Sequence, residues 1–299
     1  MPKHLFSPCL TIILSFFLQT ETCLACSLDD HELKGGFLPN NSLRIPENSK
    51  FANMITENDF NQVIDRLETL YRNDFSRKGA NLKIIRYWKG ETVNAYASRD
   101  LEKNDWIITL YGGLARHPQI TLDGFALVIC HELGHHIGGA PKKIDDMGDT
   151  VWPSNEGQSD YFATLKCLRR LYENDPNETI VAEMSIPPFL KSKCNSTFAN
   201  ANQRAICKRS AMAGLSAGQL FMALSKEPKI EFTTPDKKIV EQTYHKHPNA
   251  QCRLDTYLSG SICKRSLLEE VSYDDEFAGV CSSKFKDSQG QRPKCWHKE

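Results

Sequence analysis

The stretch CHELGHHIGG, residues 130–139, places two histidines four residues apart, with a glutamate directly after the first. In an α-helix, side chains four positions apart project from one face, so His131 and His135 can both direct a ring nitrogen at one metal ion. Glu132 lies one residue further round the helix, close to such an ion without having to bind it. A base that activates a metal-bound water must lie there, so the stretch predicts a catalytic zinc site.

A catalytic zinc site needs three protein ligands and one open position, so a third donor must come from elsewhere in the chain. The stretch NEGQSDYF offers Glu156 at the start of a further predicted helix. Asp160 follows four residues later on the same face, where it can accept a hydrogen bond from a ligand. We therefore expect one Zn²⁺ held by His131, His135 and Glu156. Alternatively, each acid is a solvated carboxylate favoured by the helix dipole.

Two neighbours of the motif have simpler interpretations. His136 follows His135 directly and points about 100° away from it around the helix, so we expect a packing or surface residue. Cys130 precedes the first ligand and projects in a different direction. We expect it to be a buried thiol or to form a disulfide with Cys167.

Taken together, these motifs resemble those of the gluzincin peptidases that include the CAAX prenyl proteases and the HtpX-like proteases. That family combines HExxH with ExxxD on the next helix. Residues 93–97 (VNAYA) and 106–114 (WIITLYGGL) look like the family's strand pair before the active-site helix, and HPNAQCR, residues 247–253, is similar to its His-Pro segment with an arginine six residues after the histidine.

The resemblance implies a zinc metalloendopeptidase in which Glu132 is the general base. It also implies that His247 stabilises the tetrahedral intermediate, with His245 as the alternative donor, and that Arg253 pairs with Asp160. The second strand of the pair, at residues 107–114, would be the sheet edge that binds a peptide or protein substrate as an extended strand.

Two other functions remain open on the sequence. The chain could be a catalytically silent zinc-binding protein that uses the same scaffold for interaction, or a zinc hydrolase of a non-peptide substrate. Glu132 argues against the first alternative, because a structural zinc site needs no base and closes its fourth position with another Cys or His.

The elements that must position these residues follow from the hydrophobic spacing. Helices are predicted at 59–75, 120–139, 155–175 and 200–226, and strands at 80–88, 93–100 and 105–114. Gly138, Gly139 and Pro141 end the site helix, and we expect a loop after it. Residues 173–199 contain three prolines and little periodicity, which indicates an insertion loop.

This order predicts an α+β fold of zincin type, stabilised by disulfides. Its small mixed or antiparallel sheet would place an edge strand on the active-site helix, and its C-terminal half would be mostly helical. We divide the chain into a signal peptide (1–25), a polar N-terminal extension (26–56), a zinc metallopeptidase domain (57–270) and a Cys-containing C-terminal tail (271–299).

The N-terminus and the cysteines predict export to the periplasm or the extracellular space. A basic start, an apolar run at residues 9–18 and small residues before Cys26 are typical of a signal peptide, and Cys26 is a candidate lipid anchor. Eight further cysteines follow, for which we expect the pairs Cys194–Cys207, Cys252–Cys263 and Cys281–Cys295. The formal net charge of zero gives no reason to expect nucleic acid, or a membrane except through that anchor.

Overall fold

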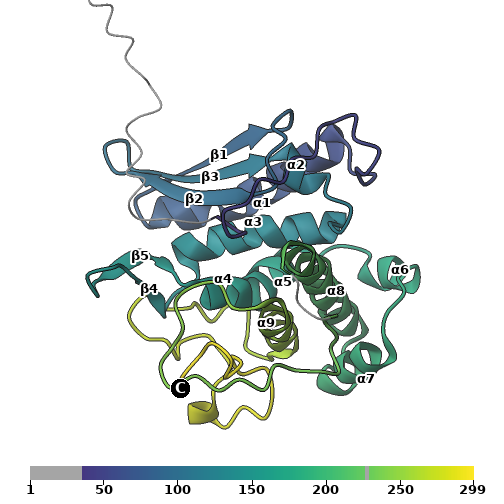
Figure 1. Cartoon of the computed structure of the whole chain (residues 1–299). Helices are drawn as coiled ribbons and strands as arrows, with labels where there is room; N and C mark the ends of the chain where they lie inside the picture. The colour runs from purple at the N-terminus through teal and green to yellow at the C-terminus, as the bar shows by residue number, and fades with distance from the viewer. Residues whose placement is uncertain (1–35, 226–228) are drawn as a thin grey trace, which may run out of the picture.

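The computed structural model describes residues 36–225 and 229–299. The signal peptide and the Cys26 anchor, both predicted from the sequence, lie outside these residues. The chain forms a mixed α+β structure with small sheets, as expected. In the C-terminal half the regular elements are almost all helices, but residues 229–249 and 263–299 lie largely outside them, so this half is less helical than predicted. Figure 1 shows the larger sheet on one side of α3 and the helices α4, α8 and α9 on the other.

The strands are β1 (Asn81–Tyr87), β2 (Ala95–Asp100), β3 (Asp105–Tyr111), β4 (Lys142–Ile144) and β5 (Thr150–Ser154). The helices are α1 (Glu57–Arg77), α2 (Gly112–Ala115), α3 (Leu122–Ile137), α4 (Glu156–Phe162), α5 (Leu168–Leu171), α6 (Asn177–Ala182), α7 (Pro188–Thr197), α8 (Ala201–Leu224) and α9 (Ala250–Ile262). A π-helical segment, η1 (Ala163–Cys167), joins α4 to α5, and η2 (Ser283–Phe285) is a 3₁₀ turn.

The larger sheet has the strand order β1-β3-β2, with β1 parallel and β2 antiparallel to β3. The prediction that residues 107–114 form the substrate-binding edge is therefore wrong, because β3 is the central strand and both of its sides are paired. Alternating apolar residues do not distinguish a central strand from an edge strand. The two outer strands of this sheet are β1 and β2. The N-terminal residues of the described chain lie beside β2, since the Phe37 amide donates to the Ala95 carbonyl.

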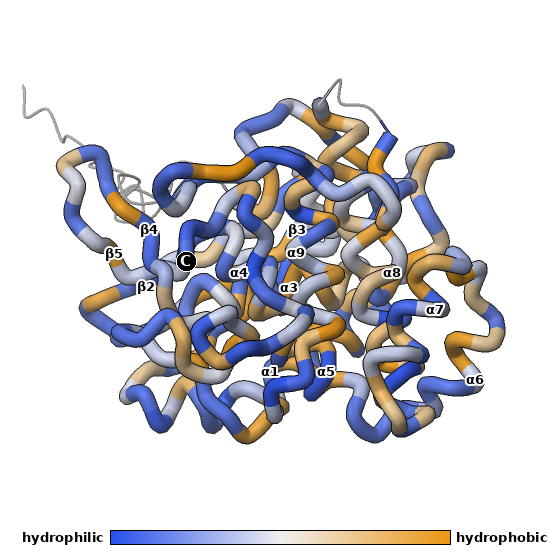
Figure 2. Tube along the Cα trace, turned by 90° about the horizontal axis from the view of Figure 1, so that it is seen from below, coloured by the Kyte–Doolittle hydropathy of each residue, from blue (hydrophilic) through white to orange (hydrophobic). Residues whose placement is uncertain are grey.

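Helix α3 is the centre of the core. It begins at the N-cap Thr121, and every residue from Gly124 to His136 is buried because the sheet covers one side and α4 and α8 cover the other. Hydrophobic stretches run through the middle of the molecule around α3 and α5, whereas many of the outer loops are hydrophilic (Figure 2).

Three segments differ from the prediction. The loop expected after the site helix contains the β4–β5 hairpin, and the insertion loop contains α6 and α7. Helix α9 follows the His-Pro segment and begins at the N-cap Asn249, whose side chain accepts from the Cys252 amide. These elements are short or flanked by prolines, so hydrophobic periodicity carries little information about them.

Within residues 36–225 and 229–299, four disulfides connect the helices to one another and to the tail. The pair Cys194–Cys207 agrees with the sequence prediction, and Cys130–Cys167 is one of the two alternatives expected for Cys130. The other two predicted pairs are wrong, since Cys252 bonds Cys295 and Cys263 bonds Cys281. The two ends of α9 carry Cys252 and Cys263, and a helix of this length separates its ends by about 16 Å, so they cannot bond each other.

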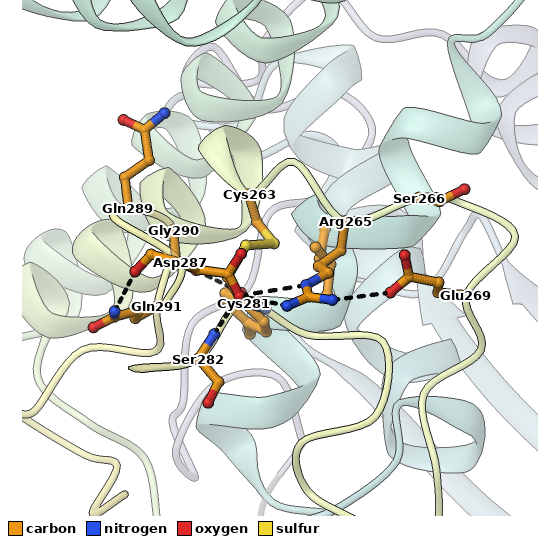
Figure 3. Close-up of a disulfide and its surroundings, with 12 residues drawn as sticks. Cys263, Arg265, Ser266, Glu269, Cys281, Ser282, Asp287, Gln289, Gly290 and Gln291 are labelled. Atoms are coloured by element: carbon orange, nitrogen blue, oxygen red, sulfur yellow. Dashed lines mark hydrogen bonds and ion pairs between the residues drawn. A yellow bond between two sulfur atoms is a disulfide. The ribbon is translucent and has the colours of Figure 1, made fainter. Parts of the chain in front are cut away.

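Around Cys263–Cys281, charged side chains add to the covalent link (Figure 3). Arg265 donates to the Asp287 carboxylate at 2.8 Å, and the Ser282 amide donates to the same carboxylate at 3.0 Å. These contacts and the disulfide hold the tail against the C-terminal end of α9. Within the described part of the chain, no helix has the length and apolar character needed to cross a membrane.

Candidate metal centre

Helix α3 presents His131 and His135 on one face, one turn apart. Both imidazoles are buried, and their ring centroids lie 4.6 Å apart with nearly perpendicular planes. Between them, Gly134 allows the next helix to approach closely, because a Cβ there would lie 3.0 Å from Ser159 Cα. The glycine in HELGH therefore brings α4 against the metal-binding face.

Helix α4 supplies Glu156 from its first turn. The N-cap Asn155 accepts from the Gln158 amide and fixes the start of the helix at Glu156. Burial opposes ionisation of Glu156, but neighbouring positive groups, the Lys143 ammonium among them, hold its pKa well below its ordinary value. The carboxylate is thus kept in the form that binds a cation.

The three predicted ligands converge. His131 Nε2 lies 3.3 Å from Glu156 Oε2, and His135 Nε2 lies 3.8 Å from Glu156 Oε1. One donor atom from each residue lies within 4.8 Å of the others. Ligands bound at about 2.1 Å in tetrahedral geometry are roughly 3.4 Å apart. The spacing therefore fits a group that could hold a metal ion.

The opposite side of each imidazole is already hydrogen-bonded. His131 Nδ1 lies 2.7 Å from the Asp160 carboxylate, and His135 Nδ1 lies 2.8 Å from the Ser154 carbonyl. Since both partners are acceptors there, each ring carries a proton on Nδ1. Burial opposes the charged form of His131, but the Asp160 and Glu156 carboxylates raise its pKa to about 9, so without a metal this ring is also protonated on Nε2. A metal ion bound at Nε2 would take the place of that proton. His131 Nε2 and both Glu156 oxygens are buried without a hydrogen-bond partner of acceptable geometry.

Asp160 is held by two residues of α9. Arg253 donates to both of its oxygens at 2.7 Å, which is the contact that the resemblance implied, and the Tyr257 hydroxyl donates to Oδ1 at 2.7 Å. All three side chains are fully buried. Burial opposes ionisation of Asp160, but the Arg253 guanidinium and His131 together outweigh it and lower the pKa of the carboxyl. A permanently charged carboxylate therefore orients His131.

Glu132 is the unpaired acid of the site. Its side chain is fully buried, and neither of its oxygens has a hydrogen-bond partner among the residues that the structure describes. Burial raises the pKa of Glu132 to about 7, although the positive charge of His131 opposes this shift. A carboxyl with that pKa can both accept and release a proton near neutral pH.

Two further side chains reach Glu156 from outside the helix pair. His247 Nε2 lies 3.3 Å from Oε2, so the His-Pro segment does bring this histidine to the site. Lys143 Nζ, from β4, lies 2.7 Å from Oε1. The sequence analysis missed Lys143, because a lysine in a short polar segment carries no signal until the β4–β5 hairpin turns it toward the helices.

Comparison with known protein families, curated proteins and solved structures finds no match to this chain. The site is therefore interpreted from its own geometry.

The remaining histidines near the site have other surroundings. His136 is stacked between Trp106 and Trp152, and its Nε2 lies 3.1 Å from the Ile107 carbonyl, which confirms the packing role. His245 Nδ1 lies 2.7 Å from the Lys142 carbonyl. Of the two histidines in YHKHPNA, only His247 has a contact to a predicted ligand among the described residues.

Proposed function

We propose that the protein is a zinc-dependent metalloendopeptidase of the gluzincin type. One observation carries the proposal. One donor atom each from His131, His135 and Glu156 lies within 4.8 Å of the others, and the Glu132 carboxyl is buried next to His131 without a hydrogen-bond partner in the described part of the chain.

Zinc is the metal that best suits this donor set. Two imidazole nitrogens and one carboxylate oxygen, with a fourth position left for water, form a common catalytic zinc site. A structural site would require a fourth protein ligand, usually Cys or His. All eight cysteines of the described chain are in disulfides, so none of them is available.

A zinc ion bound there would acidify a bound water and polarise the carbonyl of a substrate. Glu132 accepts the proton of the attacking water and returns it to the leaving amine, which its raised pKa permits. His247 donates from Nε2 to the oxygen of the scissile carbonyl as negative charge develops. Removing a donor of this kind typically costs about 3 kcal/mol of transition-state stabilisation.

The edge of β2 that β3 does not pair is the candidate site for the substrate backbone. It is the sheet edge that faces the N-terminal residues beside the metal ligands, and main-chain hydrogen bonds along an edge accept extended peptides of varied sequence. Four disulfides favour an oxidising compartment, so we also propose that the protein is exported.

The experiment compares the zinc-loaded protein with its Glu132→Gln variant on casein and on quenched fluorescent peptides. The variant should bind about one zinc per chain, as the parent does, and lose peptide cleavage by about 10²- to 10⁴-fold. Glu183→Gln, at an exposed position, is the matched control and should cleave at the parent rate.

The same assay separates the alternatives. A parent that binds zinc but cleaves neither peptides nor activated esters would be a silent binding protein. A parent that hydrolyses only esters would be a hydrolase of another class. Equal peptide cleavage by the parent and the Glu132 variant would refute the mechanism.

A further inference from the structure

Gly36, Phe37 and Leu38, here called the strap, are the first residues of the described chain, and all three are buried. They lie between β2 and the metal-binding face of α3. The Phe37 amide donates to the Ala95 carbonyl at 2.9 Å, on the side of β2 that β3 does not pair. The strap therefore occupies the edge at which an extended substrate would add a strand.

Two side chains also bind the backbone of the strap. Asn94 accepts from the Leu38 amide at 3.0 Å and donates to the Leu38 carbonyl at 3.1 Å, so it binds this residue as a neighbouring strand would. Arg253 donates to the Phe37 carbonyl at 3.1 Å. These bonds are directed at the backbone, which is how a peptide of any sequence is held.

The strap reaches the metal centre itself. The Phe37 ring packs edge-on against His131, with the ring centroids 5.1 Å apart. His247 Nε2 lies 2.9 Å from the Gly36 carbonyl oxygen and 3.3 Å from Glu156 Oε2. Since a carbonyl can only accept, His247 donates to Gly36, and the nitrogen expected to bind the scissile carbonyl is already engaged by a carbonyl of the same chain.

We propose that the strap is an autoinhibitory plug, which holds the substrate edge of β2 and the His247 donor in place of a substrate. This inference rests on the proposed peptidase function and concerns its regulation. A peptide must displace Gly36 before it can bind. The apparent affinity for substrate is therefore the intrinsic affinity multiplied by the fraction of molecules from which the strap is displaced. Release of the strap increases activity without any change at the metal ligands.

Gly36 offers a local way to expel the plug. A Cβ at this position would overlap the Ala95 carbonyl oxygen and come within 2.7 Å of Asn94 Oδ1. The strap must therefore move in Gly36→Ala, and further in Gly36→Val. The control is Asn40→Ala, an exposed position of the same segment.

The expected result is a KM that falls roughly fivefold in Gly36→Ala, equivalent to about 1 kcal/mol, and further in Gly36→Val, with kcat unchanged. Asn40→Ala should keep the KM of the parent. A variant that is merely damaged would instead lose kcat. Folded, zinc-loaded Gly36 variants with the KM of the parent, or a higher one, would overturn the proposal.

A second measurement does not depend on activity. Acylation by diethyl pyrocarbonate, mapped by mass spectrometry, should be slow at His247 in the parent, where the side chain is 20% exposed and Nε2 is engaged. It should become several-fold faster in the Gly36 variants, relative to His245 in the same molecule. An unchanged ratio means that Gly36 does not shield His247, which also overturns the plug. A parent without peptidase activity when zinc-loaded, and Gly36 variants without it, would refute the proposed function instead.

Discussion

Replacement of Glu132 by glutamine should make the metal-free protein more stable while it abolishes cleavage. The carboxyl is fully buried without a hydrogen-bond partner, and burial raises its pKa from 4.5 to about 7. A group with a raised folded-state pKa contributes its full stability below the unfolded value, and this contribution is lost as the pH rises through the folded value. The charged form therefore destabilises the native state above pH 7.

The shift of about 2.5 pH units corresponds to about 3 kcal/mol at 1.36 kcal/mol per unit. Glutamine has nearly the shape of the protonated acid but cannot ionise. Glu132→Gln should therefore match the parent in unfolding free energy at pH 4 and exceed it by about 3 kcal/mol at pH 8.

The assay is urea unfolding at 25 °C after removal of metal with a chelator, at several pH values from 4 to 8, with the disulfides intact. Glu183→Gln should follow the parent throughout, because this side chain is exposed. If the unfolding free energies of Glu132→Gln and the parent differ by the same amount at every pH in this range, Glu132 is not a buried carboxyl with a raised pKa, and the reasoning is refuted.

Three further predictions test the surroundings of the site. Asp160→Asn removes the charge that orients the His131 ring and should weaken zinc binding by about 10- to 100-fold in a chelator competition. Burial lowers the pKa of His136 to about 3, so the folded metal-free parent should lose about 1.4 kcal/mol of unfolding free energy for each pH unit between pH 5.5 and 4. His136→Phe should reduce this dependence of the unfolding free energy on pH by the same amount, as measured by urea unfolding. An unchanged dependence would contradict the neutral assignment. Replacing both Cys252 and Cys295 by alanine opens a loop of 43 residues and should lower the unfolding free energy by about 4 kcal/mol, whereas non-reducing peptide maps that link Cys252 to Cys263 would contradict the pairing.

The elements that the sequence predicted best are those with long hydrophobic periods. Helices α1, α3 and α8 and the three strands of the larger sheet lie within a few residues of their expected bounds, because each buries a repeated apolar face. Helix geometry alone predicted that His131 and His135 lie on one face of α3. Glu156 followed from the need for a third ligand.

What the sequence did not predict depends on contacts between distant segments. The central position of β3 is determined by the parallel pairing of β1, and the pairing of Cys252 with Cys295 depends on how the tail returns to α9. Lys143 reaches Glu156 only because a hairpin turns there. Gly36 meets His247 across more than 200 positions of the chain, so no local pattern could indicate that contact.

The central claim is that two imidazoles of α3 and one carboxylate of α4 bind a single zinc ion. A crystal structure of the zinc-loaded protein, with diffraction data collected at the zinc absorption edge, tests it most directly. The account predicts one anomalous peak about 2.0–2.2 Å from His131 Nε2, His135 Nε2 and an oxygen of Glu156. A peak at another place in the molecule, or none there with zinc in excess, would contradict it.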